Sequence, residues 1–132
     1  MDLRLLILVI LLILPARLNS QKKLQRPSGG IGIESIDSVV ANSFNIYDYI
    51  FDYKMRMEAG EILNEEEMCR IEEFSVHSEI LEKNAIKVSS YLDTESFLTR
   101  VKGTIQLQRA KRVLAYCRQT SNEIMIKQNA NN

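Results

Sequence analysis

Two cysteines and one histidine are the side chains of this 132-residue chain best suited to nucleophilic or metal chemistry. His77 stands eight residues after Cys69, and Cys117 lies far beyond both. A zinc site needs three or four ligands, and a cysteine nucleophile needs its base within hydrogen-bond reach; one histidine at this spacing satisfies neither requirement. The glutamates of 65–67 and 72–73 are typical of an exposed helix surface rather than of paired catalytic carboxylates. We therefore expect a protein that is not an enzyme, with no catalytic residue, metal ligand or cofactor.

The same two cysteines suit a disulfide bond. Cys69 and Cys117 each lie 24 residues from Asp93, where a turn is expected, so a helical hairpin turning there places them opposite each other. A bond between them would close a segment of 49 residues and contribute about 4 kcal/mol through chain entropy. Intermolecular pairing and free thiols remain the alternatives.

The first twenty residues predict export. Ten apolar residues, 5–14, follow Arg4 and end at Pro15, whereas a bilayer span needs about 20. A positive residue, a short apolar stretch and the small residue Ser20 are the features of a signal peptide, which we expect to occupy residues 1–20. The protein is therefore predicted to be secreted and extracellular, where cysteines are commonly oxidised.

Composition divides the exported chain into three parts. Residues 21–33 combine basic charge with proline and glycine, which predicts a flexible arm. Residues 34–127 are expected to form a helical domain, and the polar residues 128–132 a disordered tail.

Three helices are expected within the domain, at about 35–59, from Asn64 to the turn near Asp93, and at about 94–127. Gly60 suits the C-cap of the first helix. Asn64, with a glutamate three residues later, suits a capping box at the start of the second.

Apolar residues recur every three or four positions along each helix. The expected core face of the second helix consists of Ile71, Phe74, Ser78, Leu81, Ala85, Val88 and Leu92. On the third helix the apolar stripe starts at Leu98, Val101 and Ile105 and changes face within residues 103–108. We predict an all-α protein, an antiparallel three-helix bundle in which a disulfide clamps a long helical hairpin.

Opposite charges gather on the second and third helices. Residues 61–82 carry eight glutamates and one arginine, whereas residues 94–127 carry seven Lys and Arg and two glutamates. The two helices either neutralise each other or leave a basic stripe that docks an acidic receptor, glycan or membrane surface. The candidate binding surface is formed by Arg100, Lys102, Arg109, Lys111, Arg112 and Arg118.

Aromatic and methionine side chains crowd the first helix beyond what a single core face hides. Core packing, a self-association face and a binding groove all fit this pattern. The candidate apolar groove is formed by Phe44, Tyr47, Phe51 and Phe74. It defines an alternative function, that of an extracellular carrier holding a small apolar ligand between its helices.

The net charge bears on the class of partner. The exported residues carry 15 Lys and Arg against 16 Asp and Glu, so no overall field attracts nucleic acid or anionic lipid. We expect neither a nucleic-acid nor a membrane partner. An extracellular protein or receptor is the expected partner, and self-association stays open.

The segment Tyr53–Cys69 contains a helix end at Gly60 and then a capped helix start four residues before the cysteine. In this it resembles small insect seminal-fluid proteins made in male accessory glands, which carry more cysteines than the two found here. The resemblance implies a secreted reproductive factor that acts by binding. The predicted function is therefore that of a secreted, non-enzymatic binding or signalling factor that acts on an extracellular partner.

Overall fold

Three long helices make up the part of the chain that the computed structural model describes, residues 22–131. They are α2 (Glu34–Glu58), α3 (Glu65–Val88) and α4 (Phe97–Ala130), and a short 3-10 helix, η1 (Ser89–Leu92), follows α3. No strand occurs within residues 22–131. The predicted signal peptide, residues 1–20, lies outside the described range. The all-α prediction is confirmed for the described residues.

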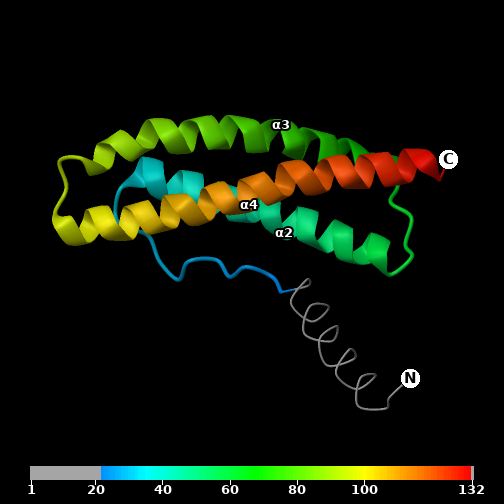
Figure 1. The fold of residues 1–132 in the computed structure, drawn as a ribbon, viewed down its shortest axis with the longest axis horizontal. Helices are drawn as coiled ribbons and strands as arrows, with labels where there is room; N and C mark the ends of the chain where they lie inside the picture. Colours follow the sequence, from blue (N-terminus) through cyan, green and yellow to red (C-terminus); the bar gives the residue numbers. More distant parts are fainter. Residues whose placement is uncertain (1–21, 132) are drawn as a thin grey trace, which may run out of the picture.

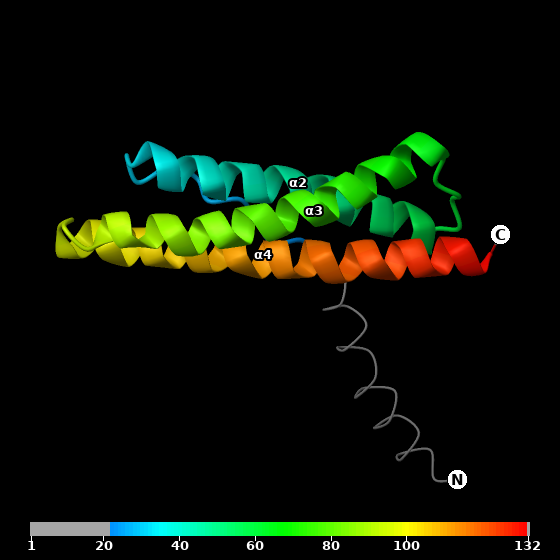
Figure 2. The ribbon, with the colours of Figure 1, turned by 90° about the horizontal axis from the view of Figure 1, so that it is seen from above.

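The helices pack side by side as an elongated bundle, in which α3 runs opposite to α2 and α4 (Figure 1). Figure 2 shows the same bundle from above, with α3 lying over α2 and α4. In both views the α3–α4 hairpin extends past the start of α2, so the first turns of α4 lie beyond the N-terminal end of α2. Within residues 22–131, no helix is both long enough and apolar enough to cross a bilayer.

The connection between α2 and α3 ends one helix and starts the next as predicted. Gly60 has a φ of +90°, in the left-handed region that favours glycine just after a helix. Asn64 is the N-cap of α3, since its Oδ1 accepts a hydrogen bond from Glu67 N at 2.8 Å. Glu67 Oε2 in turn accepts one from Asn64 N at 3.0 Å. This capping box satisfies two backbone N–H groups and confirms the predicted start of α3.

The third helix begins three residues later than predicted. Ser96 is its N-cap, and the Ser96 hydroxyl accepts a hydrogen bond from Thr99 N at 3.4 Å. The reason lies in the turn after η1, which occupies residues 93–96 and is closed by a hydrogen bond from Glu95 N to Leu92 O at 3.1 Å, so the connection is longer than predicted.

The same helix also ends three residues later than predicted, at Ala130. Gln128 Nε2 donates a hydrogen bond to Leu63 O at 2.7 Å, which ties this end of α4 to the α2–α3 connection. The first residues of the expected tail, 128–132, are therefore helical.

The core face predicted for α3 is confirmed. Its buried residues recur every seven positions, the spacing of a seam between helices that supercoil around each other. They are Ile71, Ser78 and Ala85 of α3, continued at the same spacing by Leu92 of η1. Phe74, Leu81 and Val88, which alternate with them, are partly buried against the core.

Residues 22–33 lie extended against the bundle. Leu24 N donates a hydrogen bond to Tyr47 Oη at 2.9 Å, and Arg26 bonds to both Asn45 and Asp48 of α2. The flexibility expected of residues 21–33 stays a prediction, and any such motion has to break these bonds.

The predicted disulfide between Cys69 and Cys117 is wrong, because both cysteines are free. Cys69 is exposed, whereas Cys117 is buried, and its thiol lies near enough to the Ser78 side chain for Ser78 to affect its pKa. Nearer the turn, Gly103 lies so close to Leu92 that a Cβ at position 103 would stand 2.6 Å from Leu92 Cδ2. These two close pairs define the register of the hairpin.

Both pairs are symmetric about a point between residues 97 and 98, not about Asp93. In this register Cys69 faces position 126, and it does share an open depression with Met125 and Gln128. The two cysteines are therefore offset by nine residues, or about 14 Å of helix, which is too far for a disulfide. The lengthened connection is the physical cause, since it shifts α4 along α3.

Candidate functional site on the outer face of α4

Four large apolar side chains in the first turns of α4 are exposed to solvent. They are Phe97, Leu98, Val101 and Ile105, which expose 74, 64, 40 and 52% of their surface. At 100° per residue they share a sector of about 100° on the helix. The buried residues Gly103, Leu107 and Ala110 lie on the opposite side. We call these four exposed residues the outer α4 face.

The structure shows why the apolar stripe changes face within residues 103–108, as the sequence predicted. Leu92, at the end of η1, packs on Gly103 and fixes which side of α4 points inward. Leu98 and Ile105 are then left on the far side of the helix, where neither α2 nor α3 covers them. The apolar stripe predicted for the third helix did not include Phe97, although its position directly after the Ser96 cap places it beside Leu98 and Val101.

The six candidate basic residues lie on two sides of this face instead of forming one stripe. Arg118 of α4 pairs with Glu82 of α3 at 3.1 Å, and the helical period places Arg100 and Lys111 on the same α3-facing side. The period places Lys102 and Arg109 on the opposite side, while Arg112 continues the line of the outer α4 face two turns after Ile105. Cations thus border this face on both flanks and at its C-terminal end.

Five of these cations have no ion-pair partner in the part of the chain that the structure describes. Within residues 22–131, no carboxylate lies within 4.0 Å of the charged groups of Arg100, Lys102, Arg109, Lys111 or Arg112. α4 itself has no acidic residue between Ser96 and Asn122. The mutual neutralisation of α3 and α4 considered from the sequence is therefore limited, in the described residues, to the pair of Arg118 with Glu82.

The structure brings together only three of the four rings of the candidate apolar groove, since Phe44 and Phe51 both pack on Tyr47. Phe44 and Tyr47 are buried, with 1 and 2% of their surface exposed, and the Tyr47 ring packs on Phe51 and Tyr116. Phe74 instead stacks on Tyr49 at 5.4 Å between ring centroids. The described depression that Phe44 lines, against residues 22–33, measures only about 80 Å³. These aromatic rings fill the core rather than line one ligand site.

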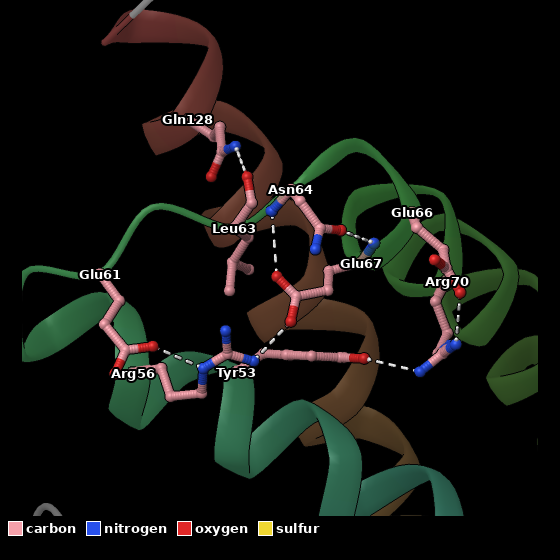
Figure 3. A network of polar contacts seen from close by, with 9 residues as sticks. All are labelled: Tyr53, Arg56, Glu61, Leu63, Asn64, Glu66, Glu67, Arg70 and Gln128. Atoms are coloured by element: carbon pink, nitrogen blue, oxygen red, sulfur yellow. Dashed lines mark hydrogen bonds and ion pairs between the residues drawn. The ribbon is translucent and has the colours of Figure 1, made fainter.

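A polar network joins the ends of the three helices on the opposite end of the bundle (Figure 3). Arg56 of α2 bonds to Glu61 at 2.7 Å and to Glu67 at 2.6 Å. Arg70 of α3 donates to Tyr53 Oη at 3.3 Å and reaches Glu66 at 3.1 Å. The hydrogen bond from Arg56 holds the pKa of Glu67 below its usual range. The network fixes the angle between α2 and α3, and its acids are all committed to partners within the chain.

The two cysteines and the histidine, the side chains best suited to nucleophilic or metal chemistry, lie apart from one another. Burial raises the pKa of the Cys117 thiol to about 12, so it carries little thiolate at neutral pH. Cys69 and His77 are both exposed, and their positions on α3 are about 12 Å apart along the axis. Within residues 22–131, no group of three or more His, Cys, Asp or Glu side chains is placed to hold a metal ion.

The chain was compared with protein-family models, with curated proteins and with solved structures, and none of the three comparisons gave a match. The functional argument therefore rests on the residues themselves.

Proposed function

We propose that this chain is a secreted, non-enzymatic binding factor whose outer α4 face docks a partner outside the cell. One observation carries the proposal: four exposed apolar side chains form a continuous face of α4, and cations that have no ion-pair partner within residues 22–131 border it. Leaving such side chains in water forgoes about 1.5–3 kcal/mol each relative to full burial, and contiguous exposed apolar surface commonly marks an interaction site.

Two parts of the proposal rest on the sequence. Secretion rests on the apolar stretch and small residue of 1–20, and a role in seminal fluid rests on the resemblance of Tyr53–Cys69 to insect accessory-gland proteins. The separation of Cys69, His77 and Cys117 supports action by binding, since no nucleophile among them has a base beside it.

Binding of fluorescently labelled protein to intact cells of the producing organism tests the proposal. The chain carrying Leu98→Ser and Val101→Ser should lose saturable binding by roughly tenfold or more, since these residues are central to the face. The matched control carries Val76→Ser and Ile80→Ser, which are similarly exposed on α3. It should bind like the natural sequence.

Circular dichroism spectra and thermal melts of both variants verify that each is folded, as expected for substitutions at exposed positions. Absence of saturable binding by the natural sequence, or equal binding by both variants, contradicts the proposed function.

A further inference from the structure

We propose that the outer α4 face docks on the surface of an anionic phospholipid bilayer, with α4 lying in the plane of the headgroups. This inference deepens the proposed function by naming the partner of the same face, and it rests on that function. It is carried by the shape of the face, by the positions of the cations around it, and by its location in the bundle.

The face is convex. Its four apolar side chains project from a single helix, and the neighbouring depressions lie to either side of it. Arg100 and Lys111 line the depression on the α3 side, and Arg109 and Arg112 line the one beside residues 22–33. A protein partner usually anchors its side chains in pockets, whereas the boundary between headgroups and acyl chains accepts projecting apolar side chains.

The cations stand where an amphipathic helix on a membrane carries them. Arg100 borders one flank of the face, Lys102 and Arg109 border the other, and Arg112 follows it along the helix. Their aliphatic stems can lie along the apolar surface while the charged groups reach the phosphates. Because these groups have no carboxylate partner among the described residues, lipid phosphates need not displace one.

Charge segregation also changes the expectation drawn from composition. A net charge near zero argued against a membrane partner, but the acids are unevenly distributed: half of the 16 in residues 21–132 belong to α3 and the α2–α3 connection, whereas α4 has none between Ser96 and Asn122. The nearest acids in the sequence are Asp93 and Glu95, which precede the helix. A second copy of the outer α4 face is disfavoured as the partner, since like charges would meet.

The location of the face permits contact with a flat surface. The first turns of α4 lie at the tip of the α3–α4 hairpin, beyond the N-terminal end of α2 (Figures 1 and 2). Further along, Ile31 and Gly29 contact α4 at Gly103 and Gln106, outside the sector of the outer α4 face. A bilayer can therefore approach these turns without meeting α2.

The absence of tryptophan from the chain gives a direct test. Phe97→Trp, introduced into the chain from Gln21 onward, places a single fluorescent reporter on the outer α4 face. Vesicles of equal parts phosphatidylcholine and phosphatidylglycerol should shift its emission to shorter wavelength, and vesicles of phosphatidylcholine alone should bind it at least about tenfold more weakly. Added salt should weaken the binding to the anionic vesicles.

A matched pair of charge variants tests the role of the flanks. Arg100→Gln with Arg109→Gln should weaken binding to the anionic vesicles about thirtyfold, from about 1 kcal/mol per cation. Lys83→Gln with Lys87→Gln removes the same charge from α3 and should leave that binding within about twofold of the Phe97→Trp parent. Circular dichroism verifies that both variants retain the helical fold.

The outcomes separate this inference from the proposed function. Equal binding to both vesicle compositions, no binding to either, or equal losses in the two charge variants overturns the bilayer partner. If vesicles fail to bind while saturable cell binding persists until the cells are treated with protease, the partner is a protein. In that case the proposed function stands and the lipid inference fails.

Discussion

A cysteine placed at position 78 tests the register of the α3–α4 hairpin, on which the burial of every α4 side chain depends. Ser78 is fully buried, and its side chain lies near the buried thiol of Cys117. Ser78→Cys, made in a chain that also carries Cys69→Ser, should therefore form a disulfide with Cys117 under mild oxidation. The natural pair of Cys69 and Cys117 should form none, since the two are offset by about 14 Å of helix.

The magnitude follows from the segment that the new bond closes. Closing the 40 residues from 78 to 117 stabilises the fold by about 4 kcal/mol through chain entropy. The substitution also removes the hydrogen bond that the Ser78 hydroxyl donates to Phe74 O at 2.7 Å, which costs about 1 kcal/mol. The reduced variant lacks this hydrogen bond as well, so the oxidised protein should exceed the reduced protein by the full contribution of about 4 kcal/mol, which raises the urea midpoint by about 2 M. Relative to the Cys69→Ser parent, the net gain is about 3 kcal/mol.

Urea unfolding followed by circular dichroism measures this gain, and peptide mapping without reduction identifies the bond. A control with Ser78→Cys, Cys69→Ser and Cys117→Ser should show no difference between oxidising and reducing conditions. Failure of positions 78 and 117 to pair, or pairing of Cys69 with Cys117 within one natural chain, would refute the register and with it the assignment of the outer α4 face.

Three further predictions concern single side chains. Cys69 should react with iodoacetamide in the native protein, whereas Cys117, which is buried and has a raised pKa, should react only after unfolding. Mass spectrometry of the labelled peptides measures the two reaction rates, and equal rates would contradict the prediction. Glu67→Gln should lower the free energy of unfolding at neutral pH, because the Arg56 guanidinium stabilises the Glu67 carboxylate and keeps its pKa in the folded protein below the unfolded value. The difference in stability between the variant and the natural sequence should therefore shrink as the pH falls through the folded-state pKa. Urea unfolding across the acid range measures this difference, and a difference that stays constant with pH would contradict the prediction. Leu63→Ala should lower the free energy of unfolding by about 2–5 kcal/mol, since only 2% of the Leu63 surface is exposed. Ile62→Ala, at the neighbouring 85% exposed site, should change it by less than about 0.5 kcal/mol, and thermal melts that rank the two variants the other way would contradict the packing of the α2–α3 connection.

The candidate site was only partly accessible from the sequence. The cations of the third helix, and the change of face within residues 103–108, were evident from residue types and spacing. The sequence did not show that Leu98 and Ile105 would be exposed, because a stripe of apolar residues does not indicate which of its parts a neighbouring helix will cover. The grouping of Phe44 with Phe74 failed for the same reason, since helical spacing alone does not tell whether two aromatic rings on different helices meet.

What the sequence by itself determined is local. Periodicity established three helices and the buried face of α3, and the side chains of Asn64 and Glu67 established where α3 begins, because each acts within a few residues of its own position. Only the tertiary structure decided the pairing of the helices along their length. The turn at residues 93–96 and the close fit of Leu92 on Gly103 shift α4 along α3, and this shift separates the two cysteines and leaves an apolar face of α4 in solvent. Register depends on contacts between residues far apart in the chain, and those contacts form only when whole helices pack.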